Sequence, residues 1–149
     1  MSILIQCDGC GAITAARPSD YSDYEHDSIT FVVRVGRRCD DKYGRDHRPR
    51  KNVHACSELC ARKVADRYHL AVLSKPCDEP TSFGDRAMFA KVVKRADDRV
   101  SVRTQFGKCG TIKTRWSTAT GECIGNDRYD REFQGERWRM VYPVPTGVR

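Results

Sequence analysis

The chain has 149 residues, of which 39% are hydrophobic and 32% are charged, and its formal net charge is +7. This length allows one domain or two small ones, and the modest hydrophobic content favours a core stabilised by a bound metal. No apolar run is long enough for a membrane-spanning helix, so we expect no membrane partner. The start, Met1–Gln6, lacks the basic and apolar regions of a signal peptide. We therefore expect a cytoplasmic protein with reduced thiols.

Two cysteine pairs carry the strongest signal. Cys7 and Cys10 lie in the sequence Cys-Asp-Gly-Cys-Gly, which is typical of a zinc knuckle, and Cys56 and Cys60 are spaced i, i+4 at the start of a predicted helix. Four thiolates from a knuckle and a helix start form a closed tetrahedral site, which predicts structural Zn²⁺ rather than a catalytic ion. Two disulfides are the alternative reading. Another donor could also replace one thiol, and the candidates are Cys39, His47 and His54.

The first half of the chain has a mixed pattern. An acidic segment at 20–27 precedes an alternating strand at 28–35 and a loop at 37–51 with seven basic and three acidic residues. We expect this loop to be either solvated and flexible or an arm that contacts phosphates. Ser57 is a good N-cap for a helix reaching about Leu73.

The second half alternates with period two. Five short strands are predicted between residues 89 and 142, and two prolines mark a linker at 76–82. The chain is therefore predicted to be α+β, with a zinc-binding α+β domain at 1–75 and an all-β domain at 83–149. The second domain is expected to be a small antiparallel β-barrel or a curled sheet, with Trp116 and Trp138 in its core.

The positive charge is concentrated in the second half, because residues 1–80 have a net charge of +1 and residues 81–149 have +6. Basic residues there alternate with apolar ones, which would gather them on one face and favour a nucleic acid as the partner. Such contacts would be to phosphates and carry little sequence preference. The candidate nucleic-acid-binding residues are Lys91, Arg103, Lys113, Arg115, Arg137 and Arg139, with Arg48, Arg50 and Lys51 from the basic loop.

Some of these motifs resemble a known group of proteins. The chain is similar to small zinc-ribbon or treble-clef-like proteins of tailed phages, particularly those infecting actinobacteria, and the second half looks like a small β-domain of similar phage proteins. The resemblance implies a host-cytoplasmic setting but no activity, since most of these proteins have no assigned function. It rests on Cys7–Gly11, Ile29–Val35 and His54–Cys60, and in the second half on Lys91–Lys94, Val100–Arg103, Thr120–Gly125 and Arg137–Arg139.

A few residues of the first half point instead to an enzyme. Asp46, His47 and Asn52 faintly resemble part of an HNH nuclease, a family that also has paired cysteines, and Pro49, Leu59, Cys60 and Lys63 complete the likeness. However, His47 and Asn52 are only five residues apart, and His69 is too far along to be the second metal-binding histidine. We therefore expect no enzyme.

The sequence has no glycine-rich phosphate loop and no evident small-molecule site. Cys77, Cys109 and Cys123 have irregular spacing, and we interpret them as small apolar residues rather than a second metal site. The leading hypothesis is a non-enzymatic, zinc-stabilised accessory protein that binds nucleic acid through its β-domain. The alternative is a module that docks on a host protein complex through the Tyr21 and Tyr24 segment or exposed aromatic residues.

Overall fold

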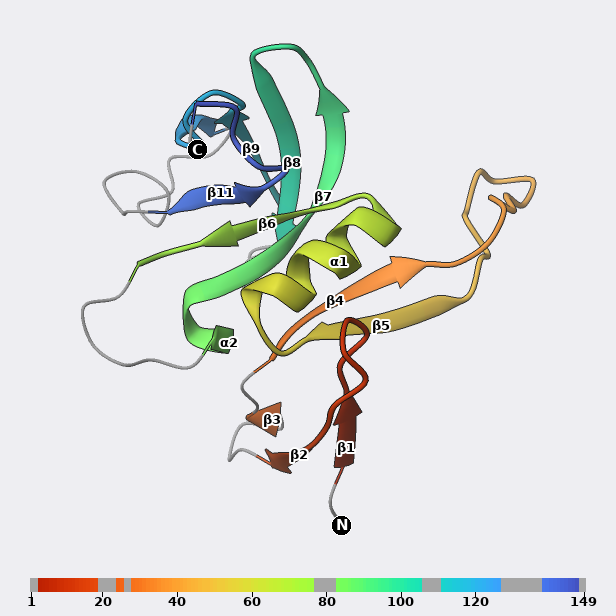
Figure 1. Cartoon of the computed structure of the whole chain (residues 1–149). Coiled ribbons are helices and arrows are strands. Elements are labelled where there is room, and N and C mark those ends of the chain that lie inside the picture. Colours follow the sequence, from red (N-terminus) through yellow and green to blue (C-terminus); the bar gives the residue numbers. More distant parts are fainter. Residues whose placement is uncertain are drawn as a thin grey trace.

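In the computed structural model the chain folds as a strand-rich α+β protein (Figure 1). The structure describes residues 3–18, 24–25, 28–76, 83–105, 111–126 and 138–147. The first half begins with a small three-stranded sheet, followed by a long two-stranded hairpin and a helix. These elements are β1 (Ile3–Gln6), β2 (Ile13–Pro18), β3 (Tyr24–Glu25), β4 (Ile29–Arg34), β5 (Arg50–Ala55) and α1 (Glu58–Tyr68).

A six-stranded antiparallel sheet follows, with the strand order β10-β9-β8-β7-β6-β11. One face of it is covered by α1 and the β4–β5 hairpin (Figure 1). The remaining elements are β6 (Leu70–Ser74), α2 (Phe83–Arg86), β7 (Ala87–Arg95), β8 (Arg99–Gln105), β9 (Thr111–Ser117), β10 (Cys123–Asn126) and β11 (Arg139–Tyr142). The five strands predicted in the second half are therefore present.

The helix is shorter than predicted. It starts as expected at Ser57, whose side-chain oxygen accepts a hydrogen bond from the Cys60 amide at 3.3 Å, but it ends at His69, which has the left-handed φ of 57°. The next four residues, Leu-Ala-Val-Leu, form the buried strand β6 instead of a last helical turn. A short apolar run fits a buried helix and a buried strand equally well by periodicity. Among the described residues, no helix has the length and apolar character needed to cross a membrane.

Strand β6 lies between two hydrophobic cores. Leu70 and Val72 pack in the core beneath α1, whereas Ala71 and Leu73 point to the opposite face of the sheet. Alternation along a strand explains this division, since successive side chains lie on opposite faces. The second core contains Trp116 and Trp138, both buried as predicted.

The six-stranded sheet curls but does not close into a barrel. The amide of Met140, on edge strand β11, donates to the Gly121 carbonyl at 2.8 Å, just before the other edge strand β10. Glu122 and Arg139 form a single isolated bridge there. Of the two predicted forms, the curled sheet is observed and the closed barrel is not, because no ladder of hydrogen bonds among the described residues joins β11 to β10.

Residues on both sides of the predicted linker share this sheet. Strand β6 precedes the linker and pairs with β7 after it, with Leu70 opposite Lys91 and Ser74 opposite Ala87. Residues 77–82 of the linker lie outside the described residues.

Candidate metal centre and basic face

The first cysteine pair lies in a tight turn between β1 and β2. The Cys7 amide donates to the Ala12 carbonyl and the Gly11 amide donates to the Cys7 carbonyl, both at 2.9 Å. Gly11 has a φ of +79°, which glycine adopts without steric cost. The Gly9 amide points at the Cys7 sulfur, 3.3 Å away. The turn therefore presents both thiols on its inner side, as the predicted knuckle requires.

Asp8 fixes this turn against the end of β5. Its amide donates to the His54 carbonyl at 2.9 Å, and its carboxylate accepts from the His54 amide at 2.8 Å. The Lys51 ammonium lies 3.3 Å from the same carboxylate and 3.0 Å from the Tyr68 hydroxyl. Sequence reasoning missed this role of Asp8, since nothing in the spacing indicates which strand the turn contacts.

Gly9 allows the turn to touch the start of α1. A Cβ atom added at Gly9 would lie 2.6 Å from the Cys60 Cβ and 2.8 Å from its Cα, well inside normal contact distances. The backbone of Gly9 is not in the left-handed region. The requirement for glycine here is therefore purely one of space.

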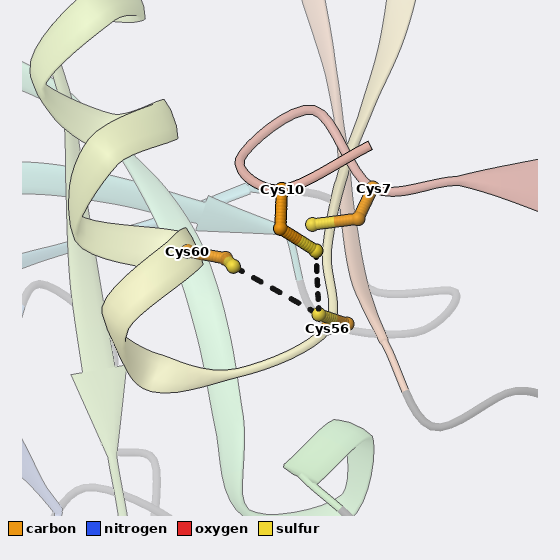
Figure 2. A group of neighbouring side chains, drawn as sticks. All are labelled: Cys7, Cys10, Cys56 and Cys60. Atoms are coloured by element: carbon orange, nitrogen blue, oxygen red, sulfur yellow. Dashed lines mark hydrogen bonds between the residues drawn. The ribbon is translucent and has the colours of Figure 1, made fainter. Parts of the chain in front are cut away.

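The four thiols converge as Figure 2 shows, with Cys7 and Cys10 from the turn, Cys60 from α1 and Cys56 immediately before it. The Sγ atoms all lie within 4.8 Å of one another. Cys10 and Cys56 are 3.6 Å apart, and Cys56 and Cys60 are 3.8 Å apart. A tetrahedral ion with bonds of about 2.3 Å to sulfur separates its ligands by about 3.8 Å. The group could therefore hold a metal ion.

The thiols differ in acidity. Burial raises the pKa of Cys7, but the amides of Cys10, Cys56 and Gly9 donate to its sulfur and bring the pKa down to about 6. Burial and hydrogen bonds with the neighbouring thiols raise the pKa of Cys56 to about 12. The Ser57 hydroxyl lowers the pKa of Cys60, yet burial and the hydrogen bonds with Cys7 and Cys10 outweigh it and raise that pKa. Four sulfurs this close cannot all be thiolates without a cation between them.

Two of the three alternative donors, Cys39 and His47, lie elsewhere among the described residues, whereas His54 lies beside the knuckle through its bonds with Asp8 but is not one of the four clustered donors. Cys39 is exposed in the β4–β5 loop, and the His47 ring there bonds to Asp41. The six described cysteines, Cys7, Cys10, Cys39, Cys56, Cys60 and Cys123, are all free, so the disulfide alternative fails for them. Cys123 is half-buried against the second core, as its apolar interpretation predicts, whereas Cys77 and Cys109 lie outside the described residues.

Three of the predicted nucleic-acid-binding residues form a row across the open sheet. Lys91 of β7 lies opposite Arg103 of β8, which lies opposite Lys113 of β9, and all three are exposed. We call Lys91, Arg103 and Lys113 the basic row. No acidic side chain among the described residues pairs with any of them. Like charges directly opposite each other destabilise a sheet, so this row is a cost to folding.

A second row on the same face adds two more cations. Lys94 lies opposite Ser101, and Ser101 lies opposite Arg115. The Arg115 guanidinium lies over Gly125 of the neighbouring strand, where an added Cβ would be 2.5 Å from its Nη2. Because Leu70, opposite Lys91, packs beneath α1, this face continues the one that α1 covers.

The other predicted contacts are placed differently. Arg48 forms a fork with Asp46, with Nη2 2.8 Å from the carboxylate, and this hydrogen bond holds the pKa of Asp46 well below its usual range. Lys51 binds Asp8, and Arg139 lies 3.4 Å from Glu122. Two further candidates are Arg50, which is exposed on β5, and Arg137, which lies outside the described residues.

The residues of the nuclease likeness are scattered. In an exposed loop, the His47 Nε2 atom lies 2.8 Å from the Asp41 carboxylate. Asn52 lies within β5, and His69 is the C-cap of α1. Strands β4 and β5 followed by α1 do form a ββα order, but these three side chains belong to different ends of it.

Comparison with known proteins identifies no relative. No protein-family model matches the chain, and no curated protein or solved structure is significantly similar to it. The resemblance to phage zinc proteins therefore stays a prediction.

Proposed function

We propose that the four-cysteine group binds a structural Zn²⁺. The donor set supports this proposal, because four sulfur ligands in a closed site suit zinc and leave no position for a substrate. The order of elements is that of a treble-clef-like unit, since a knuckle, a hairpin and a helix carrying the second pair follow one another. An ion between these elements would join the turn after β1 to β5 and α1, which already pack on each other in the first core.

We further propose that the protein is not an enzyme and binds nucleic acid on the open face of its sheet. The basic row is the observation that carries this proposal. Three cations that destabilise the free protein become favourable when a polyanion lies along them and releases its counterions. Their Cβ atoms are about 5 Å apart across adjacent strands, so the three charges form one continuous positive row.

The test is binding of a labelled single-stranded oligonucleotide by fluorescence anisotropy over a salt series. Three phosphate contacts predict a fall in affinity of about 20- to 40-fold between about 50 and 200 mM salt. We expect Arg103→Glu with Lys113→Glu to abolish binding while zinc content and the circular dichroism spectrum stay unchanged.

The matched control is Lys63→Glu with Arg86→Glu, at exposed positions on α1 and α2. It lowers the net charge from +7 to +3, as the Arg103→Glu and Lys113→Glu double variant does. This control should bind as the parent does, apart from a small uniform loss. Equal loss in both double variants would show that only net charge matters, and the proposed face would be wrong. No binding of the oligonucleotide by the parent at low salt would instead favour docking on a protein.

A further inference from the structure

The loop between β4 and β5, residues 36–49, extends beyond the hairpin and away from α1 and the large sheet (Figure 1). It is held in place by its own hydrogen bonds rather than by packing. The Asp41 carboxylate accepts from the amides of Tyr43 at 2.8 Å and Arg45 at 2.9 Å, and it bonds to the His47 ring at 2.8 Å. The Asp41 amide in turn donates to the Arg45 carbonyl at 2.9 Å. The tip at residues 41–45 is therefore preorganised.

All three carboxylates of this loop bind other groups of the loop itself. Asp40 pairs with Arg38 at 2.9 Å, and Asp46 pairs with Arg48 at 2.8 Å, while Asp41 closes the tip. Lys42 and Arg45 have no acidic partner among the described residues. Although the loop contains three carboxylates, the two charged side chains of the tip that lack an acidic partner are both positive.

Tyr43 lies between these two cations and is 72% exposed. The Lys42 ammonium is 5.0 Å from the centre of its ring, and the Arg45 guanidinium is 6.0 Å away. Both cations therefore lie over the ring in the free protein, and a base that stacks on the ring displaces one of them toward an adjoining phosphate. Apart from these cation–π contacts the ring is open to solvent, and it belongs to neither hydrophobic core.

We propose that Tyr43 stacks on an unpaired base of a single-stranded nucleic acid, with Lys42 and Arg45 contacting the adjoining phosphates. The inference rests on the proposed nucleic-acid binding and names the class of ligand. Every base has an aromatic face, so such stacking adds affinity without a strong sequence preference. A base within a duplex is already stacked on its neighbours, so the ring selects single strands over duplex.

The experiment compares the parent, Tyr43→Ala and Tyr43→Phe by anisotropy on three probes of equal length: an oligothymidine strand, the same strand with abasic sites, and a duplex. Tyr43→Ala should weaken binding of the oligothymidine about 5- to 150-fold, as expected for the loss of one stacked base. Tyr43→Phe should bind as the parent does, because the ring face is kept. On the abasic strand and the duplex, Tyr43→Ala and the parent should be alike.

Two results would overturn the inference while leaving the proposed function standing. One is a parent and a Tyr43→Ala variant with the same affinity for the oligothymidine. The other is an equal loss on the abasic and normal strands. A parent that binds none of the three probes at low salt would overturn both proposals. Unchanged thermal unfolding of Tyr43→Ala excludes a folding defect as the cause.

Discussion

Replacing Gly9 by alanine tests the contact on which the metal centre depends. The new methyl group would lie 2.6 Å from the Cys60 Cβ, so the knuckle must move by about 1 Å to restore normal contact. Metal ligands tolerate deviations of only about 0.2 Å, and this movement would carry the sulfurs of Cys7 and Cys10 away from those of Cys56 and Cys60. We expect a loss of about 2 kcal/mol in unfolding free energy from overpacking alone.

The assay has two readouts. Thermal unfolding with zinc should fall by about 4–8 °C for Gly9→Ala, as expected for about 2 kcal/mol in a chain of this size. Competition with a chromophoric chelator should show weaker zinc binding. Gly11→Ala is the matched control, because Gly11 has a left-handed φ but open space around its Cα, so it should lose some stability and keep its zinc affinity. If Gly9→Ala binds zinc as tightly as the parent and unfolds at the same temperature, the proposed geometry of the centre is wrong.

Three more predictions concern the same centre. Cys56→Ser should lose zinc and lower stability by several kcal/mol (~3–5), measured by metal analysis and denaturant unfolding, because metal-binding free energy contributes directly to folding. A Cys56→Ser variant that keeps one equivalent of zinc would contradict the assigned ligand set. At pH 7, zinc binding should release one proton from Cys56 and one from Cys60, because the pKa values of both thiols are raised. Below about pH 6 the Cys7 thiol is protonated too, and zinc binding should then release one more proton. Affinity should therefore drop more steeply below that pH, and titration calorimetry in buffers of different ionisation enthalpy counts the protons. Asp8→Ala should lower the free energy of unfolding by about 2 kcal/mol, because the His54 amide loses its acceptor. Loss of the ion pair with Lys51 should add little, since that side chain is exposed. Asp8→Asn keeps an acceptor oxygen and should recover part of the loss. No change in the unfolding of Asp8→Ala would show that the bond does not hold the knuckle.

The sequence alone was sufficient for features that depend on local chemistry. The knuckle at Cys7 and Cys10 and the helix start at Ser57 follow from residue types at fixed spacing, and both are confirmed. Alternation in residues 89–142 predicted five strands and the burial of Trp116 and Trp138, because a strand facing a core shows period two whatever its partners are. The four-cysteine group was predicted on the same basis.

Only the tertiary structure decided where these pieces meet. From the sequence, Leu70–Leu73 was predicted to be the end of a helix. In the structure the segment is a strand, because a hydrophobic core lies on each of its two faces. Lys51 and Arg48 read as free cations in the sequence, yet Asp8 and Asp46 bind them. Conversely, Lys91, Arg103 and Lys113 are far apart in the chain, and only the register of β7, β8 and β9 brings them into one row. Charge and hydrophobicity are properties of single residues, whereas pairing is set by which segments pack together, and that depends on contacts distant in sequence.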